Sequence, residues 1–310
     1  MSGYVGRFAP SPTGPLHLGS LATAIGGWLD AKTNHGRWLL RIEDVDYPRC
    51  VAGAAQHIMH TLQRFELHWD GEVMVQSQRN SAYKSALTQL TQLGLTYPCG
   101  CTRKDVEDLQ GQRQRNTTAI YPGTCRQGLA PGKTARSIRF KASETPVKWL
   151  EFDSGEQQEN VSAQSGDFVI QRADGLWAYQ LAVVVDDIVQ GITDVVRGSD
   201  LSDSTGKQIA LFRALQAEAP CYWHLPLVLN DAGEKLSKQS GATALNLACP
   251  VAEMNRAFKV FGLPDIAVET PGQWLAEAMP LWANYRGERA FKPPSKAATG
   301  ALGRPLPPKD

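Results

Sequence analysis

The stretch APSPTGPLHLGS, residues 9–20, separates a short apolar run at residues 4–9 from a longer apolar stretch at 18–33. Two of its prolines, Pro10 and Pro12, fix the backbone φ angle and stiffen the chain where the first run ends. A stiff turn between two apolar segments predicts a strand over 4–9 that is followed directly by a helix over 18–33.

His17 stands at the N-terminus of this predicted helix, where backbone N–H groups lack partners within the helix and the helix dipole is positive. Gly14 and Gly19 on either side allow a ligand to approach the backbone closely. Together these features predict an anion site, such as a phosphate site. On this turn alone, a plain strand–turn–helix corner with a solvated histidine explains the pattern equally well.

Strand and helix patterns alternate beyond this turn. The run RWLLRI at 37–42 has strand character, and apolar residues recur with helical spacing over 51–65. A further helix is predicted over 81–93, with Gly94 as its C-cap residue. Strand, helix, strand and helix in this order indicate an α/β fold with a parallel sheet.

The second half of the chain contains similar patterns. An apolar run at 180–185 predicts a strand, and apolar periodicity predicts helices over 251–261 and 273–282. Residues 291–310 hold five prolines, few apolar side chains and mostly positive charge. We therefore expect a disordered tail there.

The composition is that of an ordinary globular protein, with 310 residues, 42% apolar, 20% charged and a net charge of +1. This balance excludes a global basic field, so any nucleic-acid surface must be local. The N-terminal residues show no signal-peptide core, and no apolar run reaches membrane-spanning length. Six cysteines in a chain of this length do not indicate a disulfide framework. We expect a reduced, cytoplasmic and monomeric protein.

A second candidate site lies in the loop GEKLSKQSG, residues 233–241, where Lys235 and Lys238 flank Ser237. A lone pair of lysines is usually a solvated surface. The combination of this loop with the first turn is a more specific pattern than either stretch alone.

Together the two stretches resemble the signature motifs of class I aminoacyl-tRNA synthetases. Residues 9–20 are similar to the PSPTGxxHxG form of the HIGH motif, and residues 235–239, KLSKQ, to the KMSKS loop. Two further blocks, RIEDVD at 41–46 and YQLAVVVDDIVQGITDVVRGSDL at 179–201, are similar to the glutamyl branch of that class. The resemblance implies a Rossmann-like α/β catalytic domain.

The resemblance also implies which residues bind the amino acid. Arg7 and Arg197 would bind the side-chain carboxylate of glutamate, a role that suits the planar donor fork of arginine. Ser11 and Tyr179 would add hydrogen bonds, and Glu43 would pair with the α-ammonium group. Taken singly, Glu43 is equally typical of a surface acid and Arg197 of a salt bridge at the sheet edge.

The same resemblance implies an ATP site, with Mg²⁺ accompanying the nucleotide. His17, Lys235 and Lys238 would be catalytic, because they would hold phosphate oxygens and offset the charge of departing pyrophosphate. The attacking carboxylate is already ionised, so no general base is needed. The ATP-binding residues implied by the motifs are Pro12, Thr13, Gly14, His17, Gly19 and Lys238.

A basic segment interrupts the α/β pattern, since nine lysines and arginines face three acids over 99–141. Cys99, Cys101 and Cys125 in this segment are candidate thiolate ligands of zinc, and three unligated thiols are the alternative. The arrangement C-x-C…Y-x-x-x-C resembles the zinc site of the short glutamyl-tRNA synthetase paralogues, which implies Tyr121 as the fourth ligand. One structural Zn²⁺ ion would then brace the segment.

Domain organisation follows from this resemblance. Residues 1–96 and 167–240 would form the catalytic domain, 97–166 an inserted zinc-containing RNA-binding segment, 241–290 a helical stem-contact region, and 291–310 the tail.

The short chain resembles the paralogues that attach glutamate to the queuosine base at the anticodon wobble position of aspartate tRNA. The resemblance implies ATP, glutamate and tRNA(Asp) carrying queuosine as partners, with glutamate activated independently of tRNA. The nine basic residues would contact RNA phosphates. Three alternatives remain: a minimal glutamyl-tRNA synthetase that charges the 3′ end, a non-catalytic RNA-binding paralogue, and a ligase that passes glutamate to another molecule.

Overall fold

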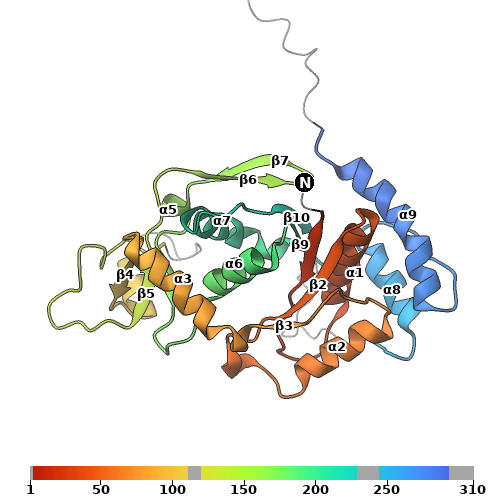
Figure 1. Cartoon of the computed structure of the whole chain (residues 1–310), viewed down its shortest axis with the longest axis horizontal. Helices are drawn as coiled ribbons and strands as arrows, with labels where there is room; N and C mark the ends of the chain where they lie inside the picture. The colour runs from red at the N-terminus through yellow and green to blue at the C-terminus, as the bar shows by residue number, and fades with distance from the viewer. Residues whose placement is uncertain (1–2, 111–119, 229–243, 293–310) are drawn as a thin grey trace, which may run out of the picture.

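The computed structural model describes residues 3–110, 120–228 and 244–292, which fold around a parallel β-sheet (Figure 1). Strands β3-β2-β1 form one half of the sheet and β7-β6-β10-β9 the other. The halves meet where the N–H of Thr193, just before β9, donates to the carbonyl of Val5 in β1 at 3.0 Å. Every pairing within the halves is parallel except the β6–β7 hairpin. The strands are Val5–Phe8 (β1), Arg37–Ile42 (β2), Met74–Val75 (β3), Val147–Glu151 (β6), Gly155–Glu159 (β7), Asp194–Gly198 (β9) and Cys221–Leu225 (β10).

Helices cover both faces of this sheet, because successive side chains of a strand point to opposite sides. On β2, Trp38 and Leu40 join a hydrophobic cluster with α1, α2, α8 and α9, whereas Leu39 joins one with α3, α6 and α7. The sheet is therefore the middle of three layers, and the predicted α/β class is confirmed. The helices are Leu18–Thr33 (α1), Ala54–Arg64 (α2), Asn80–Gln92 (α3), Tyr179–Gln190 (α6), Thr205–Ala214 (α7), Pro250–Lys259 (α8) and Pro271–Arg289 (α9).

The elements predicted around the opening turn are confirmed, and α1 spans the expected residues 18–33. The strand predicted at 180–185 is wrong, because these residues lie inside α6. This helix is buried without a break from Leu181 to Asp187, so its apolar residues run on continuously and hide the helical period. The strand of this region is β9 instead.

The segment 97–166, predicted as one insertion, contributes to two sheets. β4 (Thr96–Cys99), β5 (Ser137–Phe140) and β8 (Phe168–Gln171) form a separate antiparallel sheet, and α4 (Arg103–Gln110) follows β4. β6 and β7 extend the large sheet, and the short α5 (Val161–Gln164) precedes β8. The division of the chain into domains at residues 97 and 166 stays a prediction.

The last helix, α9, is tied to α1 through a buried carboxylate. Asp30 of α1 accepts hydrogen bonds from Arg286 at 2.7 Å and from Trp282 at 3.3 Å. The N–H of Phe291 then donates to a carbonyl in the β6–β7 turn, so the predicted tail begins in contact with the protein. The rest of that tail, 293–310, lies outside the described residues.

None of the helices in the described part of the chain is long and apolar enough to cross a membrane.

Candidate active site

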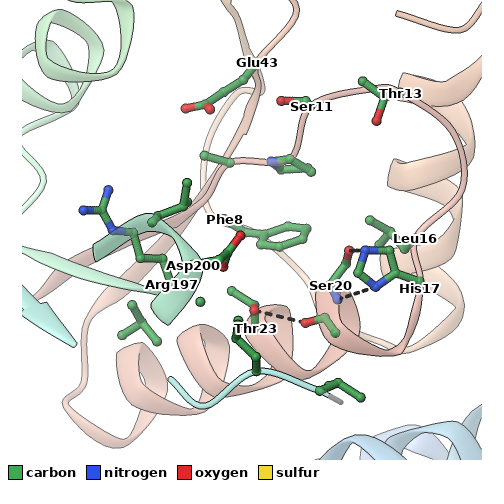
Figure 2. A pocket seen from close by; sticks show the side chains of 18 of the residues that line it. Phe8, Ser11, Thr13, Leu16, His17, Ser20, Thr23, Glu43, Arg197 and Asp200 are labelled. Carbon is green, nitrogen blue, oxygen red and sulfur yellow. Dashed lines mark hydrogen bonds between the residues drawn. The ribbon is translucent and has the colours of Figure 1, made fainter. Parts of the chain in front are cut away.

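A cavity of about 550 Å³ opens at the carboxyl ends of the central parallel strands (Figure 2). Its walls come from the turn after β1, the first turns of α1, the end of β2, and the segments after β9 and β10. Ligands of open parallel sheets bind at this edge, because loops and helix N-termini converge there. The opening stretch of the sequence thus forms one wall of the cavity.

Most of the predicted site residues line this cavity. They are Arg7, Ser11, Thr13, Gly14, His17, Gly19, Glu43, Tyr179 and Arg197. Pro12 is buried behind the turn instead, where its carbonyl accepts the N–H of Val51 at 2.9 Å. Lys235 and Lys238 lie outside the described residues. The ligand-binding roles of all these residues stay predictions.

The two ends of the cavity differ in character. Figure 2 shows Arg197 and Glu43 toward one end, and His17 with Ser20 toward the other. We call the first the arginine end, comprising Arg7, Arg197, Glu43 and Tyr179, and the second the helix end, comprising His17, Ser20 and the first turn of α1. Burial and the nearby charge of Glu43 raise the pKa of Tyr179, so this hydroxyl stays protonated as a donor.

Both guanidinium groups of the arginine end are buried and held by other side chains. Arg7, 6% exposed, donates from Nε to Asp187 at 3.3 Å. Arg197, 3% exposed, donates from its terminal nitrogens to Gln208 and Thr205, each at 2.8 Å. The side-chain partners of Arg197 are neutral, so its fixed and desolvated guanidinium group favours a carboxylate ligand.

An ion-pair network lies beneath the arginine end. The fully buried Arg41 lies 2.7 Å from Asp187 and 3.1 Å from Glu43. Burial alone would raise the pKa of Asp187, but Arg41 and Arg7 hold it below its ordinary value. Burial raises the pKa of Glu43 despite the same two arginines. Counting Arg197, three guanidinium groups face two carboxylates, which leaves one positive charge for an anionic ligand.

α6 carries a second buried carboxylate, Asp186, next to Asp187. The partners of Asp186 are Tyr83 Oη at 2.7 Å, Gln76 Nε2 at 2.9 Å and Arg79 Nε at 3.0 Å. These partners lie on α3 and on the turn that precedes it. The two neighbouring aspartates of α6 are therefore anchored to different elements, one to the strands and one to α3.

The helix end presents the first turn of α1. His17 is the N-cap residue, and its Nδ1 accepts the N–H of Ser20 at 3.3 Å. Because Nδ1 accepts, the proton of the neutral ring is assigned to Nε2, 3.2 Å from Ser20 Oγ. Gly19 makes room for the ring, since a Cβ there would lie 3.2 Å from the imidazole Cε1. A helix N-terminus with an imidazole beside it suits phosphate oxygens.

Sequence reasoning misses four polar side chains that line the cavity, Ser20, Thr23, Arg49 and Asp200, and the supporting pair Arg41 and Asp187. The supporting pair does leave a signal. Each of the two is a charged residue within an apolar run, and such a charge requires a buried partner.

The three cysteines predicted as zinc ligands come together at the small antiparallel sheet. The Sγ atoms of Cys99, Cys101 and Cys125 lie within 4.8 Å of one another, and those of Cys101 and Cys125 are 3.6 Å apart. Tyr121 Oη lies 3.3 Å from Cys99 Sγ and 3.6 Å from Cys101 Sγ. Two sulfurs bound to one tetrahedral zinc ion at about 2.3 Å are roughly 3.8 Å apart, so this donor set fits such an ion.

The acidity of the candidate ligands differs. Burial opposes ionisation of Cys99, but hydrogen bonds from Tyr121, the backbone at 101 and Arg139 lower its pKa to about 7. Burial and the three cysteines raise the pKa of Tyr121, so its hydroxyl stays protonated unless a coordinating metal ion displaces the proton. Tyr121 as the fourth ligand therefore stays a prediction.

Among those of the nine predicted phosphate contacts that the structure describes, four have partners within the protein. Arg103 pairs with Glu107 and Lys133 with Asp105, each at 3.0 Å. Arg126 pairs with the buried Asp167 at 2.5 Å. Arg139 stacks over the Tyr121 ring at 3.7 Å and donates to Cys99 Sγ at 3.2 Å. Phosphate contacts by these residues stay a prediction.

Comparison with known proteins agrees with this fold and cavity. Residues 4–250 match the family described as tRNA synthetases class I (E and Q), catalytic domain. The parallel sheet, with its cavity at the strand ends and the HIGH-like turn, therefore defines a class I aminoacyl-tRNA synthetase catalytic domain.

The similarity to particular relatives narrows this class. The Glutamyl-Q tRNA(Asp) synthetase of Cupriavidus metallidurans is 51% identical to this chain, over 97% of this chain and 98% of the relative. The protein of the same name from Bordetella bronchiseptica is 50% identical, over 92% and 91%. The chain belongs to the glutamyl-Q tRNA(Asp) synthetase family.

A solved relative shares the architecture. The glutamate tRNA ligase of Elizabethkingia meningosepticum, in complex with its amino acid, superposes with a TM-score of 0.67 at 29% identity. The matched region covers 77% of this chain and 53% of that ligase, so this chain matches about half of the longer protein.

Proposed function

We propose that the protein activates glutamate with ATP, without needing tRNA for that step, and transfers glutamate to the queuosine base at the anticodon wobble position of tRNA(Asp). The observation that carries the proposal is the two-ended cavity. A buried pair of arginines at one end suits a side-chain carboxylate, and a helix N-terminus at the other suits phosphate.

Arg7 and Arg197 bind the glutamate side chain in this proposal, while Ser11 and Tyr179 add hydrogen bonds. Glu43 pairs with the α-ammonium group, and its partner Arg41 keeps it in place. This arrangement leaves the α-carboxylate of the substrate directed toward the helix end, because the side chain and the amino group are held at the other.

The reaction then needs positioning more than acid–base chemistry. An α-carboxylate oxygen attacks the α-phosphorus, the bond to the bridging oxygen breaks, and pyrophosphate leaves. His17 and the N–H groups of α1 hold phosphate oxygens, and Lys235 and Lys238 offset the charge of the leaving group. Mg²⁺, when it accompanies the nucleotide, neutralises further phosphate charge.

The acceptor is proposed from the relatives, whose names specify tRNA(Asp) and queuosine chemistry. A hydroxyl oxygen of the queuosine ring attacks the carbonyl carbon of the adenylate, and AMP leaves. The cysteine cluster would hold one structural Zn²⁺ ion that braces the inserted segment 97–166, which would bind RNA. The helices of 241–290 would contact the RNA stem.

A second candidate function is that of a minimal glutamyl-tRNA synthetase, because the solved relative is a glutamate tRNA ligase. Labelled glutamate, ATP and purified tRNAs separate the two functions. We expect transfer to tRNA(Asp) only when it carries queuosine, with the label in the anticodon-loop fragment after nuclease digestion. Label on the 3′-terminal adenosine, or equal transfer to tRNA lacking queuosine, would support the minimal synthetase instead.

A further inference from the structure

Arg197 is held by more partners than an ordinary ion pair provides. Its guanidinium carries five N–H groups. Nη1 donates to Gln208 and Nη2 to Thr205, each at 2.8 Å, and Nε donates to His224 Nε2 at 3.0 Å. One N–H therefore remains on each terminal nitrogen, and these are the two donors that a carboxylate accepts side by side.

His224 is in turn fixed by Glu151. Arg197 and His224 are paired neighbours on the parallel strands β9 and β10, and β6 lies on the other side of β10. Oε1 of Glu151 lies 2.8 Å from His224 Nδ1 and also accepts the backbone N–H of His224 at 3.0 Å. The two side chains are only 10% and 9% exposed, so water does not replace these bonds.

This chain of bonds fixes the tautomer of His224. Arginine has no acceptor, so His224 Nε2 accepts from Arg197. The ring proton is therefore on Nδ1, where Glu151 accepts it. A doubly protonated ring would turn an N–H toward the Nε–H of Arg197 across 3.0 Å, so the arrangement requires the neutral imidazole.

We propose that His224 and Glu151 are positioning residues that orient the Arg197 guanidinium and thereby set the preference for glutamate. This inference rests on the proposed function, in which Arg197 binds the side-chain carboxylate. Without the acceptor at Nε, the guanidinium pivots on its bonds to Thr205 and Gln208. The two remaining donors then no longer point together at one carboxylate.

The test is ATP–pyrophosphate exchange with glutamate and with glutamine, in the wild type and three variants. His224→Phe keeps a ring that can stack on Tyr222 but removes the acceptor and the donor. His224→Gln restores an acceptor for Arg197. Trp149→Phe is the matched control, because Trp149 donates at 3.3 Å to the other oxygen of Glu151, Oε2, and the bond from Oε1 to His224 stays in place.

We expect His224→Phe to raise KM for glutamate about 10- to 100-fold, the effect of leaving a buried donor unsatisfied, with KM for ATP and kcat nearly unchanged. Its preference for glutamate over glutamine should fall by a similar factor. His224→Gln should recover most of both losses, and the Trp149→Phe control should stay within about twofold of the wild type.

Unchanged glutamate KM and unchanged discrimination in a folded His224→Phe protein would overturn the inference while leaving the proposed function intact. If His224→Phe does not fold, Glu151→Gln takes its place, and the inference then requires a smaller rise in glutamate KM without a change in ATP KM. A wild-type protein without glutamate-dependent exchange would overturn the proposed function, and the inference with it.

Discussion

The arginine end of the cavity and the cysteine cluster both hold reactive groups close together, but they depend on different parts of the protein. The arginine end draws Arg7 from β1 and Arg197 from β9, which are far apart in the sequence, and both residues have protein partners. The cysteine cluster takes its candidate ligands from residues 99–125. Its hydrophobic cluster has five buried residues, and three of them are the candidate ligands themselves.

This difference has a physical consequence. The arginine end is built on the main hydrophobic clusters, so its geometry exists before any ligand binds. Around the cysteines the apolar core is limited to that five-residue cluster, so a metal ion would contribute folding free energy there. We therefore expect changes in the cavity to alter rates and selectivity, and changes in the cluster to alter local folding.

The largest expected effect concerns the preformed charge of the arginine end. Glutamine would leave the net positive charge of the arginine end uncompensated, so the wild-type kcat/KM for glutamate should exceed that for glutamine by roughly 10⁴. Exchange assays with both amino acids measure this ratio. Comparable activation of the two would show that the buried arginines do not select the ligand charge.

The next effect concerns the phosphate chemistry proposed for Lys238. Lys238→Ala should lower the rate of glutamate-dependent exchange by about 10²–10³, because its charge would act on the leaving pyrophosphate in the transition state. Lys259→Ala is the matched control, since Lys259 pairs with Asp265 on the surface at 2.8 Å. A Lys238→Ala protein with the wild-type exchange rate would remove this lysine from the catalytic set.

The cysteine cluster should respond in the opposite manner. Wild-type protein should contain about one zinc ion per chain, and Cys125→Ser should lose it. Transfer to tRNA should then fall about tenfold or more, while exchange, which needs only the cavity, should change little. Cys249→Ser is the control, because Cys249 is exposed and lies outside the cluster. Freshly purified wild type without zinc, or equal losses of exchange and transfer, would break the distinction between the two regions.

The smallest effect concerns the acid stability of the small sheet. Although burial raises the pKa of Asp167, hydrogen bonds from Arg126, Tyr97 and the backbone of Ala142 lower it below its ordinary value. The stabilisation is therefore present above pH ~4 and is lost as the pH falls through the lowered pKa.

Asp167→Asn should lower the free energy of unfolding of this sheet by about 1–3 kcal/mol at neutral pH. It should also make this free energy fall less steeply as the pH decreases. Urea titrations between pH 3 and 7 (roughly the range over which carboxylates titrate) measure both quantities. If the free energy of unfolding falls as steeply with decreasing pH in the variant as in the wild type, the pH dependence belongs to another carboxylate.

The sequence allowed prediction of the elements whose signals are local. The prolines and glycines of the opening turn, together with the apolar residues on either side, are sufficient to predict β1, α1 and β2. α6 was misassigned because a helix buried on most sides has no polar face to reveal its period.

Candidate site residues could be named from the motifs, but their supporting contacts could not. His224 and Glu151 lie 27 and 46 residues from Arg197 in sequence, and only the pairing of β9, β10 and β6 brings the three together. The sequence also gives no indication that β6 lies in a different sheet from β4 and β5, because short strands carry no signal that identifies the sheet to which they belong.

The adjacent aspartates of α6 also limit how the amino-acid pocket can be re-engineered. Asp187 binds the arginines of β1 and β2, and Asp186 binds partners on and just before α3. Any rotation or sliding of α6 that widened the pocket would break one of these two sets of bonds. The position of α6 is thus fixed by buried polar contacts to two different parts of the protein. To admit a different amino acid, a designer must therefore replace side chains at the strand ends, because α6 behind them cannot shift to enlarge the pocket.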